Sequence, residues 1–180
     1  MLTITIPGME YWDEVNEQFI TSKAQTLQLE HSLVSLSKWE SKWHKSFIHT
    51  KEKTDEEVLD YIRCMTTTQN VDPEVYNRLT RKNIDEINQY IDNPMTATTF
   101  SEDKNGKRNK EIITAEVIYY WMVSLNIPPE YQKWHLNRLI TLIRVCNVKN
   151  TPSKKRSMRE IMAQNRALNE ARKKQLNSKG

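Results

Sequence analysis

Glycine is scarce in this chain, and the scarcity constrains the fold more than any other feature. The 180 residues include three glycines, Gly8, Gly106 and Gly180. Sandwiches and barrels built from many short strands usually need more turn glycines than this. A hydrophobic fraction of 37%, with five Trp and seven Tyr, is sufficient for a folded core. The sequence therefore predicts a mainly α fold, a helical bundle.

The N-terminal residues depart from the helical pattern. Residues 3–6 read Thr-Ile-Thr-Ile and are followed by Pro7-Gly8, which is typical of a short strand and a turn. Residues 26–36 alternate again, and they fit either a second strand or the beginning of a helix. We therefore expect a small N-terminal β element.

Helix signals dominate from residue 54 onward. Thr54 and Glu57 have the spacing of a capping box, which predicts a helix over residues 54–67. The paired acids Glu56-Glu57 are expected to be solvated on its surface. Similar signals predict helices that begin at Asp72-Pro73, at Thr80 and at Thr114.

Two further stretches complete the domain. Residues 95–110 are polar around Asn-Gly and fit an exposed hairpin. Residues 114–126 and 129–146 are strongly apolar and are separated by Pro128-Pro129. We predict that they form an antiparallel helical hairpin, with the second helix buried on most of its circumference.

Catalytic and metal-binding motifs are not evident. Cys64 and Cys146 lie in apolar helical stretches and are expected to be reduced and buried. The four histidines lack metal-ligand spacing, and His135 is expected to make a structural hydrogen bond. No glycine-rich phosphate loop or nucleophile elbow occurs in the sequence. We therefore expect a protein that is not an enzyme and needs no cofactor.

The beginning of the sequence and its apolar runs bear on localisation. The first eight residues lack a basic start and a long apolar core, so they do not resemble a signal peptide. No apolar run approaches the roughly 18 residues that span a bilayer. We expect a soluble, cytoplasmic protein that does not contact a membrane.

Charge is distributed unevenly along the chain. Residues 149–180 hold ten Lys/Arg and two Glu, a net charge of +8, whereas residues 1–148 hold 17 basic and 21 acidic residues, a net charge of −4. Residues 150–153, Asn-Thr-Pro-Ser, are typical of a hinge. We predict a helical domain over residues 1–150 and a basic C-terminal helical tail over residues 151–180, mobile or docked on a partner. The basic residues of this tail are Lys154, Lys155, Arg156, Arg159, Arg166, Arg172, Lys173 and Lys174.

The basic tail fits several partners. Its Lys and Arg side chains could contact phosphates, but no aromatic residues are interleaved to stack on bases. A solubilising role or an acidic protein partner is therefore favoured over nucleic acid. An acidic domain and a basic tail could also associate head to tail as a homo-oligomer.

Large aromatic side chains are the candidate protein-binding residues. Trp39 and Trp43 are four residues apart and share a helix face, with Phe47 following. They are either core or surface anchors, and core is the favoured interpretation. The full candidate set is Trp39, Trp43, Phe47, Trp121 and Trp134.

Four stretches of the sequence resemble one family of small bacteriophage proteins. They are residues 29–33 leading into 38–44 (Lys-Trp-Glu-Ser-Lys-Trp-His), residues 60–65, residues 90–100, and residues 118–122 through 132–139. The family is that of the tail assembly chaperones of long-tailed phages, and the similarity covers nearly the whole chain.

The resemblance implies a protein of the infected bacterial cytoplasm. Such chaperones bind the tape measure protein, keep it from aggregating, recruit the major tail protein that forms the tail tube, and are absent from the virion. A virion structural protein, such as a head–tail connector or a tail completion protein, is the first alternative. A nucleic-acid-binding accessory protein is the second alternative.

Overall fold

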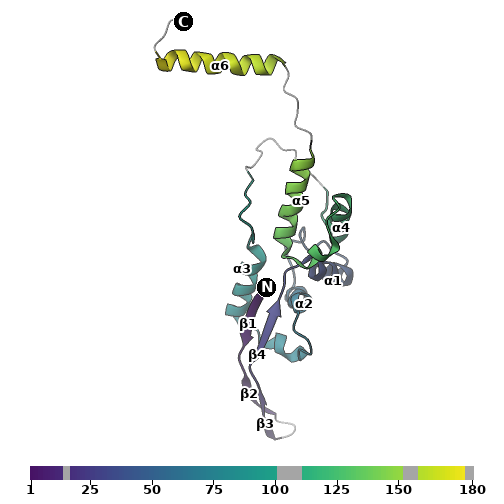
Figure 1. The fold of residues 1–180 in the computed structure, drawn as a ribbon. Coiled ribbons are helices and arrows are strands. Elements are labelled where there is room, and N and C mark those ends of the chain that lie inside the picture. Colours follow the sequence, from purple (N-terminus) through teal and green to yellow (C-terminus); the bar gives the residue numbers. More distant parts are fainter. Residues whose placement is uncertain (14–16, 101–110, 152–157, 177–180) are drawn as a thin grey trace. The chain divides into compact units, whose positions relative to one another are not determined.

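The chain divides into two units, which are described separately. The computed structural model describes residues 1–13, 17–100, 111–151 and 158–176. The first unit, Met1–Asn147, is called the body, and the second is Val148–Gly180. Figure 1 shows the elements in chain order. The protein is mainly helical with a small N-terminal β element, as the sequence predicts.

The body contains both strands and helices. The strands are β1 (Leu2–Ile6), β2 (Met9–Asp13), β3 (Gln18–Ser22) and β4 (Gln25–Leu29). The helices are α1 (Leu33–Trp43), α2 (Asp55–Met65), α3 (Arg81–Asp92), α4 (Ala115–Ser124) and α5 (Leu136–Asn150), with 3-10 turns η1 (Pro73–Arg78) and η2 (Pro129–Lys133). The second unit contains the last residues of α5 and the helix α6 (Met158–Leu176).

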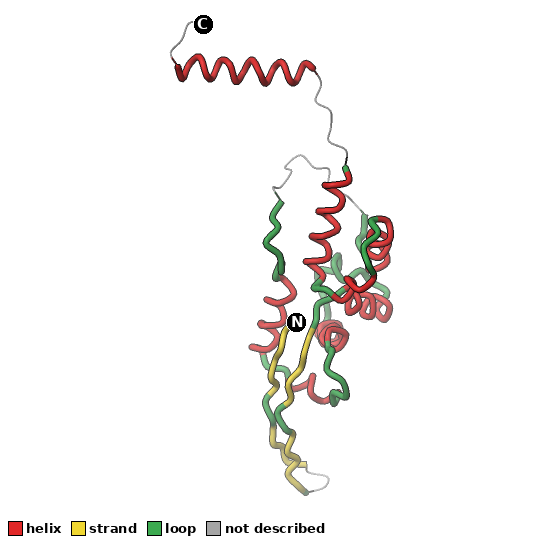
Figure 2. The backbone as a smooth tube through the Cα atoms, viewed as in Figure 1, coloured by secondary structure: helices red, strands yellow, loops and turns green. Residues whose placement is uncertain are grey.

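The strands form two successive halves of one long antiparallel hairpin (Figure 2). A single register runs through both halves, with Leu2 opposite Leu29 and Asp13 opposite Gln18. The hairpin is interrupted at Pro7, which has no backbone N–H to donate. The turn expected at Pro7-Gly8 is therefore a break within a strand, and the chain reverses later. We call the outer half, β2 and β3, the arm; it extends beyond the helices of the body (Figure 1).

Gly8 lies at the break, where the two strands of the hairpin approach closely. A Cβ added to Gly8 would lie 2.6 Å from the carbonyl oxygen of Ser22 and 3.1 Å from the backbone nitrogen of Ala24. Both neighbours are backbone atoms and cannot rotate away. We therefore expect Gly8→Ala to lower the free energy of unfolding by about 1 kcal/mol, measured by urea denaturation. Ala24→Ser, at an exposed position between β3 and β4, serves as the control.

The first of two apolar clusters lies beneath the inner half of the hairpin. Ile4, Ile6, Leu27 and Leu29 point from β1 and β4 into it. Helices α2 and α3 and turn η1 close it, and α3 packs along β1. On the other edge, β4 hydrogen-bonds to the segment that follows α2, including Thr67 N to Gln28 O at 2.8 Å. Both edges of the inner hairpin are therefore covered by the body.

The second cluster joins α1, α4 and α5. Leu36 of α1, Ile118 of α4 and Leu139 of α5 are fully buried in it. Helix α4 packs on α1, so the predicted pair of helices is part of a three-helix arrangement. The prediction that the second helix is buried on most of its circumference is wrong, because α5 is buried only at Leu136, Leu139 and Ile143. Phe47, in the loop after α1, packs against both clusters.

Glu40 fixes the position of α4 relative to α1. Its buried carboxylate accepts a hydrogen bond from Ala115 N at 2.7 Å and another from Phe47 N at 2.8 Å. The predicted cap residue Thr114 occupies the N-cap position but makes no capping side-chain hydrogen bond. A carboxylate from another helix therefore satisfies the first backbone donor of α4.

Several local predictions are confirmed. Thr54 and Glu57 form a capping box at the start of α2, and Thr80 caps α3. Asp72 caps the turn that Pro73 opens, which is a 3-10 helix.

Other local predictions are wrong. The helix expected over 129–146 is split into η2 and α5, because His135 between them pairs with Ser32 in a β-bridge. Glu57, which was expected to be solvated, is buried. Its carboxylate accepts a hydrogen bond from Thr54 N within the capping box and another from Lys45 Nζ at 2.6 Å. Cys64 and Cys146 are free, as expected, but only half-buried.

The hairpin expected over 95–110 and the predicted hinge can be compared with the structure only in part. Residues 95–100 contain no strand. Residues 101–110, and residues 152–157 around Pro152-Ser153, lie outside the described residues.

Candidate functional site

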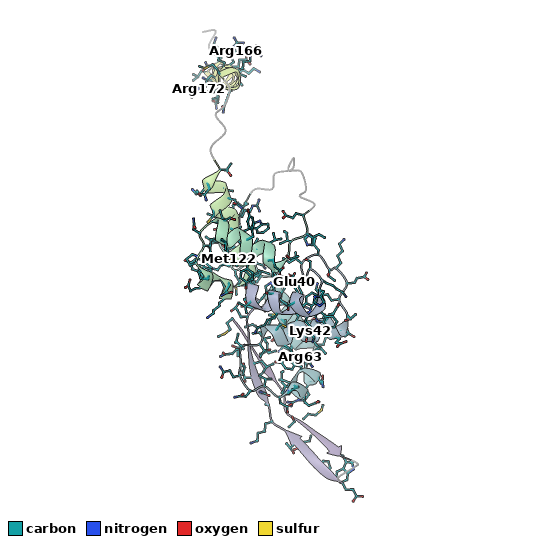
Figure 3. All side chains as sticks on the ribbon, turned by 90° about the vertical axis from the view of Figure 1, so that its right-hand side faces the viewer. Glu40, Lys42, Arg63, Met122, Arg166 and Arg172 are labelled. Carbon is teal, nitrogen blue, oxygen red and sulfur yellow. The ribbon has the colours of Figure 1, made fainter. Side chains whose placement is uncertain are left out.

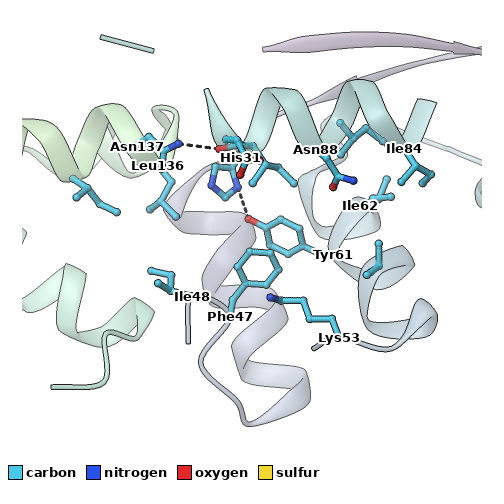
Figure 4. A pocket seen from close by; sticks show the side chains of 15 residues that line it. His31, Phe47, Ile48, Lys53, Tyr61, Ile62, Ile84, Asn88, Leu136 and Asn137 are labelled. Carbon is cyan, nitrogen blue, oxygen red and sulfur yellow. Dashed lines mark hydrogen bonds between the residues drawn. The ribbon is translucent and has the colours of Figure 1, made fainter. Parts of the chain in front are cut away.

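A pocket of about 470 Å³ lies on the body between α2, α3, α5 and the loop that follows α1 (Figure 4). We call it the isoleucine pocket. Its lining includes Ile48, Ile62, Ile84, Ile87, Ile91 and Ile140. The periodicity of α3 places three of them on one face, and the other three come from separate segments. Such an apolar lining suits aliphatic side chains of a partner.

The floor of the pocket carries a buried histidine. His31 Nδ1 lies 2.6 Å from the hydroxyl of Tyr61, and the His31 ring packs edge-on against His135 with centroids 5.1 Å apart. His135 Nε2 contacts the carbonyl oxygen of Tyr90 at 3.0 Å, which confirms its expected structural role. Burial, reinforced by His135, lowers the pKa of His31 to about 3. Burial also lowers the pKa of His135, so both rings are uncharged at neutral pH.

Polar side chains border the apolar lining of the pocket. Lys53 Nζ donates to Thr50 O at 2.6 Å and lies 4.3 Å from the centroid of the Phe47 ring. Burial lowers the pKa of Lys53, and the nearby Glu57 carboxylate opposes that shift. Asn88 and Asp92 of α3 also line the pocket, and both are exposed. A partner that fills the apolar space would therefore meet polar side chains of both signs at its border.

The first three candidate aromatic residues have different environments. Trp39 is fully buried and donates from Nε1 to Glu57 O at 2.8 Å, so it is core. Trp43 is half-buried and donates to Asp60 at 3.0 Å. Phe47 is half-buried, stacks on Tyr61 with centroids 3.8 Å apart, and forms a wall of the isoleucine pocket. Of the three, Phe47 alone lines the candidate site.

The other two candidate aromatic residues belong to the second cluster and its surroundings. Trp121 of α4 is half-buried against that cluster. Trp134 stacks on Tyr131 with ring centroids 4.1 Å apart, and the Arg138 guanidinium lies 4.1 Å from the Trp134 ring centroid. Neither residue lines the isoleucine pocket.

The basic residues of the tail lie on α6 where the structure describes them. Arg159, Arg166, Arg172, Lys173 and Lys174 are exposed on this helix. Lys154, Lys155 and Arg156 lie outside the described residues.

An exposed aromatic pair on the arm was not among the sequence candidates. Trp12 and Phe19 are opposite one another on β2 and β3, with ring centroids 4.9 Å apart. Their exposed fractions are 49% and 72%. Alternation in the sequence could have placed them on one face, but it could not show that the body leaves this face uncovered.

The described residues contain neither a metal-binding cluster nor a membrane-spanning helix. Among them, no group of three or more His, Cys, Asp or Glu side chains is arranged to hold a metal ion. Within the same ranges, none of the helices has the length and apolar character needed to cross a bilayer. The chain matches no family model, curated protein or solved structure.

Proposed function

We propose that the chain is a non-catalytic binding protein of the tail assembly chaperone type. It holds the tape measure protein of a long-tailed phage in the host cytoplasm, and it recruits the major tail protein to it. The sequence resemblance suggests the client, and the isoleucine pocket is the observation that carries the binding role. A long helical client presents apolar side chains at intervals of three and four residues, and an apolar groove is a common receptor for such a face.

The dimensions and lining of the pocket support this kind of client. A volume of about 470 Å³ accommodates a few aliphatic side chains and leaves no room for a folded domain. Ile48 at the border is 41% exposed, so it is accessible to a partner. Filling the pocket would remove apolar surface from water, which is the main source of favourable binding free energy.

The proposal predicts a specific effect of Ile48→Asp. The change places a carboxylate at the edge of the apolar surface without altering a buried side chain. We expect co-expressed tape measure protein to be retained about tenfold less well in a pull-down, equivalent to about 1.4 kcal/mol. The matched control is Val123→Asp on α4, which alters a 76% exposed residue that does not line the pocket.

Two outcomes would contradict the proposal. If the unchanged chain retained neither the tape measure protein nor the major tail protein, the client assignment would be wrong. If Ile48→Asp and Val123→Asp reduced retention equally, the isoleucine pocket would not be the binding site. Detection of the chain in purified virions would favour the structural-protein alternative.

A further inference from the structure

The exposed face of the arm has the composition of a binding surface. Trp12 and Phe19 form a cross-strand pair there, and Glu10, two residues before Trp12, lies on the same face. An aromatic pair left in water is a frequent anchor of protein interfaces, because covering it yields a large free-energy gain over a small area. Residues 9–22 contain four acidic residues and no basic residue. The arm is therefore an aromatic surface within an acidic segment.

Helix α6 has complementary properties. All its described side chains are exposed, and Met158, Ile161, Met162 and Leu168 recur at spacings that place them along one stripe. Arg159 and Arg166 are seven residues apart and flank this stripe on one side. Figure 3 shows the side chains of α6 radiating around its axis, including Arg166 and Arg172. Most helical stability in proteins comes from packing of an apolar face, so packing of the apolar stripe would stabilise α6.

We infer that the arm of one copy binds α6 of a second copy. The aromatic pair would cover the Met and Ile stripe, and Glu10 and Glu17 would lie near Arg159 and Arg166. Methionine packs adaptably against aromatic rings, and the opposite charges favour this pairing over arm–arm or helix–helix contacts.

The sizes of the two surfaces are compatible. Five-residue strands extend about 17 Å, and the 19 residues of α6 extend about 28 Å, so one arm spans a little over half of one helix. Each copy carries one surface of each kind, so the contact is heterologous and can continue from copy to copy. This association is separate from client binding at the isoleucine pocket.

The experiment uses reciprocal charge reversal in the full chain. The arm variant carries Glu10→Arg and Glu17→Arg, and the helix variant carries Arg159→Glu and Arg166→Glu. Each variant alone places like charges at the proposed contacts between residues 10 and 17 of the arm and residues 159 and 166 of α6, so we expect its self-association to be at least about tenfold weaker than that of the unchanged chain. In an equimolar mixture, each arm can meet a helix that carries the opposite charges at these contacts, so association should return. Light scattering after size-exclusion chromatography, across protein concentrations and at two salt concentrations, gives the masses.

The controls separate this contact from a general charge effect. Glu116→Arg with Glu130→Arg makes the same charge change at two exposed sites outside the arm, and it should leave association unchanged. Circular dichroism checks that every variant is folded. A monomeric unchanged chain at all concentrations, variants that associate normally, or a mixture that stays monomeric would each overturn the inference. Association that is indifferent to Trp12→Ser with Phe19→Ser would overturn the role of the aromatic pair.

Discussion

Replacing Glu40 by alanine is expected to lower the free energy of unfolding of the body by about 3 kcal/mol. The substitution removes the acceptor of two backbone N–H groups, those of Ala115 and Phe47. A donor left unsatisfied away from water costs about 1–3 kcal/mol. Urea denaturation, monitored by circular dichroism, measures the loss of stability. The slope of the unfolding free energy against urea concentration checks that unfolding stays cooperative.

The control for Glu40 is Glu116→Ala, an exposed acidic residue in the first turn of α4. It should lower stability by no more than about 0.5 kcal/mol, because it removes only a favourable interaction with the helix dipole. Glu40→Gln retains the size and one acceptor oxygen, so its effect should lie between the other two. Equal effects of Glu40→Ala and Glu116→Ala would show that Glu40 does not hold α4 in place.

Acidification from pH 7 to pH 5 is expected to lower the free energy of unfolding by about 2 kcal/mol through His31, whose pKa falls from 6.5 to about 3 on burial. The folded protein keeps the imidazole neutral, whereas the unfolded chain binds a proton below its pKa. Stability therefore decreases as the pH falls through the window between these two values. Burial also lowers the pKa of His135, which adds to the effect in the same direction.

The groups that face His31 do not supply a compensating charge. They are the His135 ring, the Tyr61 hydroxyl and the Phe47 ring, and burial raises the pKa of Tyr61, so its hydroxyl stays protonated. Glu30 and the N-terminal ammonium act on His135 with opposite signs.

The test compares urea denaturation at pH 7, 6 and 5 for the unchanged chain and for His31→Gln. The variant should be less stable at pH 7, but its stability should change less with pH, since one titrating group has been removed. Glu57 also has a lowered pKa, chiefly because Lys45 hydrogen-bonds to it, but its contribution is lost at lower pH than this range. A pH dependence that is identical in both proteins would show that His31 is not the responsible group.

Local features of the fold could be predicted from the sequence, because their causes are local. The capping box of Thr54 and Glu57 spans four residues, and the alternation of residues 3–6 marks a strand regardless of its surroundings. The break at His135 could not be predicted, because it depends on pairing with Ser32, about a hundred residues earlier. The same reason applies to Glu40, whose partner Ala115 lies 75 residues away.

The candidate site was only partly predictable for a related reason. Phe47 was a candidate as an aromatic residue, and a helix beginning at Thr80 was predicted where α3 lies. The pocket, however, arises where segments from four parts of the chain leave space between them, and no single segment indicates this space. Exposure is equally non-local, which explains why Trp12 and Phe19 were missed as candidates.

The position of Phe47 couples occupancy of the pocket to the integrity of the whole body. Its ring packs against both apolar clusters and also forms a wall of the isoleucine pocket. A bound client would contact the side chain that joins the two clusters. Binding would therefore stabilise both apolar clusters against thermal unfolding. Client loading should therefore sharpen and raise a single thermal transition instead of protecting one half of the body.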